Sequence, residues 1–172
     1  MATEQIFREI SKYISFQKLS AILVIGFLLF AINSIVFNYL IKKYKIWKYQ
    51  KSGLYEIDRM HGREFEKYLE AQFLKSGYKV SLTSYQNDYG ADLVAYKNNK
   101  KIVIQAKRWN NKVGVKAIQE IVAAKGHYKA TDAWVMTNNY YTKQAIELAA
   151  SNDVKLYDRT TIVKQIKSIE AI

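Results

Sequence analysis

Residues 87–93 read NDYGADL and residues 102–109 read IVIQAKRW, and these two runs decide the fold of the chain. Turn-forming residues separate them, which predicts two antiparallel strands joined by a tight turn at Asn98-Asn99. This turn would place Asp92 directly opposite Gln105, with Cβ atoms about 4.5–5.5 Å apart. Lys107 lies two residues further along and would share a face with Gln105, because side chains alternate along a strand.

A carboxylate, an amide oxygen and an ammonium group on one face suit phosphodiester hydrolysis. Mg²⁺ takes oxygen ligands and keeps several waters, so Asp92, Gln105 and the Ala106 carbonyl group could hold it, with Mn²⁺ as a substitute. The cation would polarise the phosphoryl group and acidify a bound water, and Lys107 would orient that water or stabilise developing charge. The simpler alternative is an ordinary amphipathic hairpin whose outer face carries Asp, Gln and Lys.

The stretch from Met60 to Val154 resembles the Mrr-like restriction endonucleases, a branch of the PD-(D/E)xK nuclease superfamily. The segments that carry the resemblance are, in chain order, GREFEKYL at 62–69, GYKV at 77–80, DYGADL at 88–93, QAKRW at 105–109, VGV at 113–115 with QE at 119–120, VMTN at 135–138 and YTKQA at 141–145. Gln105 stands where the wider superfamily has an acidic residue, which is typical of this branch. The resemblance implies a restriction-endonuclease-like α/β fold and a metal-dependent deoxyribonuclease.

By position, the resemblance implies Asp92 and Gln105 as metal ligands, Lys107 as the catalytic lysine and Glu66 as a supporting acid on the first helix. Glu66 borders the apolar stripe of that helix, so it either helps through a metal-bound water or is a solvated acid near Arg63.

Several further polar residues are weaker candidates. Asp88 either adds charge to the metal pocket or only hydrogen-bonds its own turn. Basic and polar side chains after the hairpin would attract a polyanion, and the expected DNA contacts are Arg108, Lys112, Lys116 and Gln119. For Trp109, just past the strand, packing is expected rather than stacking on a base.

A second feature lies upstream, where no charged residue interrupts the 23 residues from Leu19 to Ile41. A helix of this length is roughly 34 Å long, enough to cross a hydrocarbon core of about 30 Å. It is too long for a signal-peptide core, and we therefore expect a transmembrane helix that is retained. The alternative is a buried helix of a soluble protein, although such helices rarely lack a polar face.

The charges that flank this span predict its orientation. Arg8, Lys12 and Lys18 precede it, and a denser group follows it, namely Lys42, Lys43, Lys45, Lys48 and Lys51. The positive-inside rule then places the second half of the chain on the cytoplasmic side of the cell membrane as part of a single-pass protein.

The pattern divides the chain into a short N-terminal segment (1–18), the transmembrane helix (19–41), a basic juxtamembrane linker (42–57) and a catalytic domain (58–172). Within that domain we expect a mixed central sheet flanked by helices, with the hairpin at its active edge. The expected elements are a helix at 58–75, strands at 78–83, 91–97 and 101–108, a helix at 115–126, a strand at 132–137, a helix at 141–151, a strand at 154–157 and a final helix. The sequence has no cysteine and two histidines, which excludes thiol chemistry and a zinc cluster of the usual kind.

These patterns favour a membrane-anchored, Mg²⁺-dependent DNA endonuclease of the restriction or defence type. Two alternatives stay open, a junction resolvase acting on branched DNA and a non-catalytic module that tethers DNA or a partner protein at the membrane. A neutral glutamine supplies less negative charge than a glutamate, so activity could require high Mg²⁺ or a second chain in a homodimer.

Overall fold

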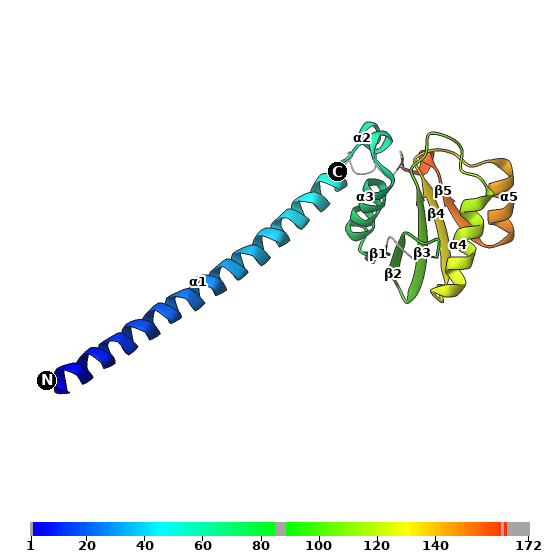
Figure 1. Ribbon diagram of the computed structural model, residues 1–172. Coiled ribbons are helices and arrows are strands. Elements are labelled where there is room, and N and C mark those ends of the chain that lie inside the picture. The colour runs from blue at the N-terminus through cyan, green and yellow to red at the C-terminus, as the bar shows by residue number, and fades with distance from the viewer. Residues whose placement is uncertain (1, 85–88, 163, 165–172) are drawn as a thin grey trace. The chain divides into compact units, whose positions relative to one another are not determined.

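The computed structural model describes residues 2–84, 89–162 and 164 (Figure 1). In chain order the elements are α1 (Ala2–Gln50), α2 (Leu54–Arg59), α3 (Gly62–Lys75), β1 (Lys79–Leu82), β2 (Leu93–Lys97), β3 (Lys100–Lys107), α4 (Val115–His127), β4 (Asp132–Thr137), α5 (Lys143–Ser151) and β5 (Val154–Tyr157). The chain divides into two compact units, residues 1–45 and residues 46–172.

The second unit is built on a mixed five-stranded sheet in the order β1-β2-β3-β4-β5. Strands β1, β2 and β3 pair antiparallel, whereas β3, β4 and β5 pair parallel. The expected mixed sheet flanked by helices is therefore confirmed. The expectation that the hairpin forms an edge is wrong, because β1 pairs with β2 and β4 pairs with β3.

The predicted hairpin register is confirmed over the length of β2. Leu93 pairs with Ile104 and Lys97 pairs with Lys100, which leaves Asn98 and Asn99 as the two turn residues. Both asparagines have positive φ, 50° and 60°, as a tight two-residue hairpin turn requires. Asparagine tolerates this left-handed region better than most residues, so the turn and its register follow from local sequence.

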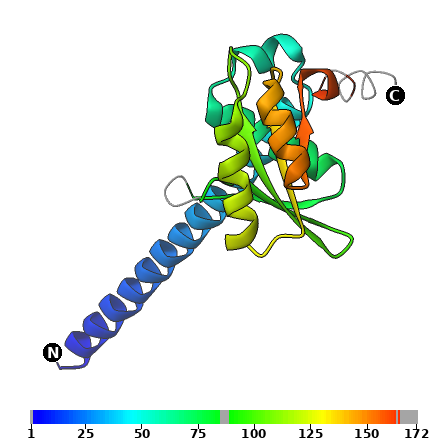
Figure 2. The same ribbon diagram turned by 90° about the vertical axis from the view of Figure 1, so that its right-hand side faces the viewer.

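Helices cover both faces of the sheet, with α3 on one face and α4 and α5 on the other (Figure 1). Figure 2 views the sheet from the side of α4 and α5. Strand alternation divides the core accordingly. Val94, Val103 and Val135 pack with α4 and α5, whereas Leu93, Ile104 and Trp134 pack with α3.

The helix expected at 58–75 is two helices in the structure, α2 and α3. Met60, which ends α2, is extended, with φ −65° and ψ 146°, and His61 begins α3. The backbone N–H of His61 donates to the Glu64 carboxylate at 3.0 Å, which satisfies an amide left free at the helix start. A local cap thus interrupts a segment whose apolar periodicity continues. Of the expected final helix, residues 159–162 are helical, and its remainder falls mostly outside the described residues.

Helix α1 runs continuously over 49 residues, through the expected N-terminal segment and span and into the basic stretch. Among the described residues it is long and apolar enough to cross a membrane, by length and composition alone. Its polar Asn33 and Ser34 each donate to a carbonyl oxygen of their own helix, at 2.9 Å. Such bonds lower the cost of placing polar side chains in lipid.

The last turn of α1 belongs to the second unit. The Gln50 side chain donates to the carbonyl oxygen of Ala71 at 3.1 Å, and the Gln72 side chain donates to the carbonyl oxygen of Tyr49 at 3.4 Å. The Tyr49 ring also packs against the core beneath α3. The unit that carries the sheet therefore begins inside the basic stretch.

Candidate active site

Gln105 and Lys107 lie at the end of β3, on the face that α4 covers. The residues that alternate with them, Ile102, Ile104 and Ala106, pack on the opposite face with α3. The predicted division of this strand between two faces is therefore confirmed. Gln105 is buried, with 3% of its surface exposed, whereas Lys107 is half-buried.

Asp92 lies immediately before β2, where the regular pairing of the hairpin ends. Its backbone N–H donates to the carbonyl oxygen of Ile104 at 2.9 Å, although Ile104 is the ladder partner of Leu93. One carboxylate oxygen of Asp92 accepts from the N–H of Ala106 at 2.7 Å. Asp92 is thus not in regular register with Gln105. Its carboxylate instead contacts the backbone between Gln105 and Lys107.

Thr83, which follows β1, holds the backbone at Asp92 from the other side. Its hydroxyl group lies 2.6 Å from the carbonyl oxygen of Ala91 and 3.0 Å from that of Asp92. Its backbone N–H also donates to the Asp92 carbonyl oxygen, at 2.9 Å. These bonds restrain the peptide that carries the Asp92 carboxylate.

The end of β3 that carries Lys107 is held by the end of β4. The Thr137 hydroxyl group donates to the carbonyl oxygen of Lys107 at 2.6 Å, and the Asn138 side chain accepts from the N–H of Trp109 at 2.9 Å. Asn138 in turn donates to Asp58 at 3.1 Å, and Arg159 binds both oxygens of that carboxylate at 2.7 Å. Hydrogen bonds from Arg159 lower the pKa of Asp58, so this buttress stays charged at neutral pH.

Glu120 on α4 contacts the candidate site residues, whereas the sequence pattern predicted a role for its neighbour Gln119, as a DNA contact. One carboxylate oxygen of Glu120 accepts from the Gln105 amide at 2.7 Å and from the Lys107 ammonium at 3.2 Å. Its other oxygen lies 3.9 Å from the Lys116 ammonium. Burial raises the pKa of Glu120, but the hydrogen bond from Gln105 and the charges of Lys107 and Lys116 outweigh it, so this pKa lies below its usual range.

A signal for Glu120 was present in the helical periodicity. Ala117, Ile121 and Ala124 are buried on one side of α4, and Glu120 lies three residues after the first and four before the last. Gln119 points elsewhere and is exposed. An acid that continues an apolar stripe is expected to face the sheet, where it requires a partner.

Gly90, two residues before Asp92, brings the hairpin against α4. A Cβ atom at this position would lie 2.7 Å from the carbonyl oxygen of Glu120 and 2.9 Å from its Cβ atom. The φ of Gly90 is also positive, at 90°. Close approach and backbone conformation therefore both require glycine. Asp88, the weaker acidic candidate, lies outside the described residues.

We expect Gly90→Ala to destabilise the domain by about 1–3 kcal/mol, because the new methyl group meets the α4 backbone and the residue is strained at this φ. Urea unfolding followed by circular dichroism would measure the change. Gly114→Ala is the matched control, since a Cβ atom there meets no atom within 4 Å. Equal stability of the two variants would contradict the close contact.

Glu66 lies on α3, which covers the opposite face of the sheet from α4. Its side chain is largely buried, and its carboxylate forms an ion pair with Arg63 one turn earlier. The structure therefore places Glu66 with its own helix. Gln105 and Lys107 lie together on the α4 side, and the Asp92 carboxylate is bonded to the N–H of Ala106 between them.

The expected DNA contacts have different surroundings. The Arg108 guanidinium group donates a hydrogen bond to the carbonyl oxygen of Asp58 and another, at 3.3 Å, to the side-chain oxygen of Asn110. Lys112, Lys116 and Gln119 are exposed. Trp109 is 51% exposed, so the expectation that its indole packs is wrong. Its backbone N–H is bonded to Asn138, and its side chain lies in solvent just past the end of β3.

The residues present fit a hard divalent cation. The Gln105 amide oxygen is buried and has no hydrogen-bond partner among the described residues, which leaves its lone pairs open to a ligand. The Asp92 carboxylate supplies a charged oxygen from the adjoining strand. No cluster of three or more His, Cys, Asp and Glu side chains gathers within residues 2–84 and 89–162. A metal here would depend on few protein ligands and keep several waters, as Mg²⁺ commonly does.

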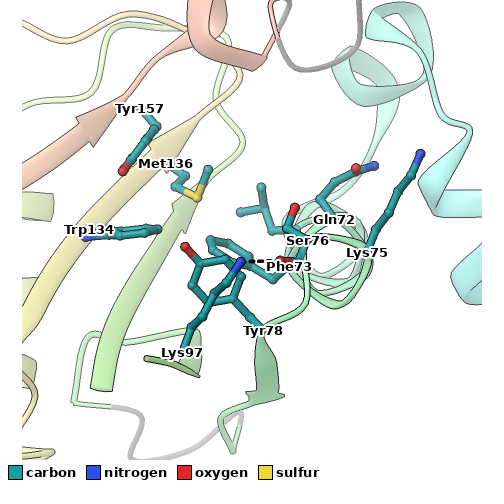
Figure 3. A pocket seen from close by; sticks show the side chains of 10 residues that line it. Gln72, Phe73, Lys75, Ser76, Tyr78, Lys97, Trp134, Met136 and Tyr157 are labelled. Atoms are coloured by element: carbon teal, nitrogen blue, oxygen red, sulfur yellow. Dashed lines mark hydrogen bonds between the residues drawn. The ribbon is translucent and has the colours of Figure 1, made fainter. Parts of the chain in front are cut away.

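A cavity of about 460 Å³ lies elsewhere, between α3 and the sheet (Figure 3). Its walls include the rings of Phe73, Tyr78, Trp134 and Tyr157, and Lys97 donates to the carbonyl oxygen of Ser76 at 2.7 Å. Its lining includes none of the candidate catalytic residues. Gln105 and Lys107 instead face α4 on the other side of the sheet.

Two solved structures have a similar fold. A protein of unknown function, AF1548, has 18% sequence identity and a TM-score of 0.51, over 59% of this chain and 64% of that chain. The DNA modification-dependent restriction endonuclease AspBHI has 19% identity and a TM-score of 0.50, over 70% of this chain and 36% of that chain. At these identities the similarity concerns the fold. The similarity covers less than two thirds of the length of either protein.

Comparison with protein families is more specific. None of the curated proteins matches the sequence. The restriction endonuclease family model Mrr_cat matches residues 57–166, which include β1 to β5, α3, α4 and α5 and all the residues gathered at the end of the hairpin. Because this match covers well over half of the chain, the protein belongs to the Mrr_cat restriction endonuclease family.

Proposed function

We propose that the chain is a membrane-anchored, divalent-metal-dependent DNA endonuclease of the restriction or defence type. The observation that carries the proposal is the convergence of Asp92, Gln105 and Lys107 at one end of the β2–β3 hairpin, inside a restriction endonuclease domain. The buried Gln105 amide oxygen has no hydrogen-bond partner among the described residues, and the Asp92 carboxylate is bonded to the next residue of β3. Amide and carboxylate oxygens are ligands that a hard cation prefers.

In this proposal Asp92 and Gln105 hold Mg²⁺ or Mn²⁺ next to a phosphodiester. When bound, such an ion polarises a phosphoryl oxygen and lowers the pKa of a bound water. The Ala106 N–H orients the Asp92 carboxylate, and Lys107 supplies positive charge where the phosphate becomes more negative in the transition state. Glu66 enters only as a supporting acid on α3, because its carboxylate is already paired with Arg63.

Exposed groups around the site support DNA as the substrate. Lys112, between β3 and α4, and Lys116, in the first turn of α4, lie in solvent and can neutralise phosphates. Gln119 adds a neutral hydrogen-bonding group. Trp109 presents an exposed indole next to the catalytic strand. Arg108 is the weaker DNA contact, since the backbone of Asp58 already engages its guanidinium group.

The proposal predicts that the full chain, purified in detergent, cuts DNA when Mg²⁺ or Mn²⁺ is present and not in excess EDTA. Supercoiled plasmid and a four-way junction should be compared in gel assays at matched DNA concentration. Preferential cutting of the junction would favour the resolvase alternative. DNA binding without cleavage at any metal concentration would favour the non-catalytic tether.

We further propose that α1 anchors the protein as a single-pass helix, with the nuclease domain on the cytoplasmic side. The absence of charged residues from Leu19 to Ile41 within α1 and the greater positive charge after this span support this arrangement. In this arrangement the nuclease domain would have access to DNA in the cytoplasm.

Deletion of residues 1–45 is expected to move the protein from the membrane pellet to the supernatant, since the apolar span is lost. The cut is placed before Ile46 because Tyr49 and Gln50 contact α3. A matched variant of the full chain, with Lys42, Lys43 and Lys45 changed to Gln, should stay in the pellet. A truncated protein that still pellets at high salt would contradict anchoring by α1.

A further inference from the structure

The Gln105 side chain has two different ends, and the structure assigns them unequal surroundings. Its NH₂ group donates to Glu120 at 2.7 Å, whereas its oxygen is buried without a hydrogen-bond partner among the described residues. An ionised carboxylate only accepts hydrogen bonds, so the end of the amide that faces Glu120 must be the NH₂ group. Glu120 thereby selects one of the two amide orientations.

The same Glu120 oxygen also accepts from Lys107, at 3.2 Å. This ion pair is partly sheltered, with 23% of the Lys107 side chain and 31% of the Glu120 side chain exposed. One atom on α4 therefore contacts both polar side chains at the end of β3. Charge-assisted hydrogen bonds of this kind restrain the rotamers of both groups more strongly than neutral ones.

The position of Glu120 is itself fixed against the hairpin. Gly90 approaches the Glu120 backbone so closely that no Cβ atom would fit between them. The loop that leads into Asp92 and the peptide of Glu120 are consequently in contact. The segment before β2, the end of β3 and α4 thus meet, although two strands, a turn and a loop separate Asp92 from Glu120 along the chain.

We propose that Glu120 is a positioning residue that takes over the electrostatic role of the carboxylate that position 105 lacks. It turns the Gln105 oxygen toward the metal, holds Lys107 beside it and contributes the negative charge that a glutamate at 105 would bring. Glu120 touches neither the metal nor DNA in this scheme. The inference rests on the proposed function, because it assigns a metal-binding role to the Gln105 oxygen.

If Glu120 supports Gln105 in this way, the carboxylate and the amide should still function when their positions, 105 and 120, are exchanged. Glu120→Gln removes the charge and lets the Gln105 amide adopt either orientation. Gln105→Glu places two carboxylates at hydrogen-bond distance, which is repulsive. The double variant Gln105→Glu/Glu120→Gln restores one carboxylate and one amide, with the carboxylate on the strand beside Lys107.

Binding of Mn²⁺ to the full chain in detergent, without DNA, measures this directly by electron paramagnetic resonance. We expect Glu120→Gln to weaken Mn²⁺ binding by about 10–100-fold, the usual loss when a group that supports a metal ligand is removed. The double variant should return to within about threefold of the unmodified protein, a recovery that a purely structural role for Glu120 would not produce. Glu147→Gln is the control, since it makes the same substitution at a carboxylate on α5 that is 63% exposed and lies 3.8 Å from the Lys143 ammonium group.

Thermal unfolding of each variant separates loss of folding from loss of metal binding. If folded Glu120→Gln binds Mn²⁺ and cuts DNA as the unmodified protein does, or if the double variant stays as weak as Glu120→Gln, the role assigned to Glu120 is wrong and the proposed function stands. If the unmodified protein itself neither binds Mn²⁺ nor cuts DNA, the proposed function fails, and this inference fails with it.

Discussion

Lys107→Ala is expected to lower the rate of DNA cleavage by about 10²–10⁴-fold, the range typical for loss of a group that transfers a proton or stabilises charge in a transition state. DNA affinity and folding should change little. Lys107 is half-buried, but Glu120 keeps a partner when the ammonium group is removed, because Gln105 still donates to the same oxygen. The variant therefore removes the ammonium group of Lys107, and the Glu120 carboxylate keeps its hydrogen bond from Gln105.

Lys116→Ala is the matched control for that experiment. It removes the same charge from the same carboxylate, yet the Lys116 side chain is 86% exposed and lies 3.9 Å from the other oxygen of Glu120. We expect it to weaken DNA binding modestly and to leave the maximal cleavage rate within a few fold. Single-turnover cleavage at saturating DNA distinguishes the two effects. Equal losses in both variants would reduce Lys107 to one of several basic contacts.

Asp92→Asn is expected to abolish detectable cleavage and to weaken Mn²⁺ binding by more than about 100-fold, since losing a charged ligand should cost more than losing a group that only supports one. Asparagine suits this test because its amide oxygen can still accept from the Ala106 N–H, which the Asp92 carboxylate now does at 2.7 Å. The local backbone should therefore keep its geometry. Titration of Mn²⁺ without DNA, together with a plasmid cleavage assay, would measure both effects.

Asp132→Asn controls for loss of a carboxylate elsewhere in the sheet. Asp132 begins β4, pairs with Lys155 at 3.3 Å and has a lowered pKa, where hydrogen bonds and charge from Lys155 outweigh the opposing effect of burial. Its substitution should affect stability slightly and metal binding not at all. If Asp92→Asn binds Mn²⁺ as tightly as the Asp132 variant does, Asp92 is not a ligand.

The hairpin was predictable because its determinants are local. Two asparagines that tolerate positive φ define the turn, and the turn sets which residues pair. Side-chain alternation then divides β3 between the two faces of the sheet. The register of β2 with β3 and the shared face of Gln105 and Lys107 followed from these rules without reference to the rest of the fold.

Two other predictions, one about a helix boundary and one about side-chain burial, were wrong. The break between α2 and α3 was missed, because the cap at His61 interrupts an apolar pattern that continues on both sides of it. Trp109 was expected to pack and is exposed. Whether an indole at a strand end is covered depends on which loop passes over it, and the sequence near Trp109 carries no information about that loop.

Sequence patterns alone indicated the α/β class, the hairpin with Asp92, Gln105 and Lys107, and an apolar stretch long enough to cross a membrane. These features can be recognised in the sequence because periodicity, turn chemistry and composition act over short distances along the chain. Helical periodicity could have shown that Glu120 faces the sheet, but only the tertiary structure shows that one of its oxygens contacts both Gln105 and Lys107, and that Gly90 lies against its backbone. These contacts depend on the rotation and distance at which α4 packs on the sheet. That placement results from the packing of the whole core, which no single segment of sequence encodes.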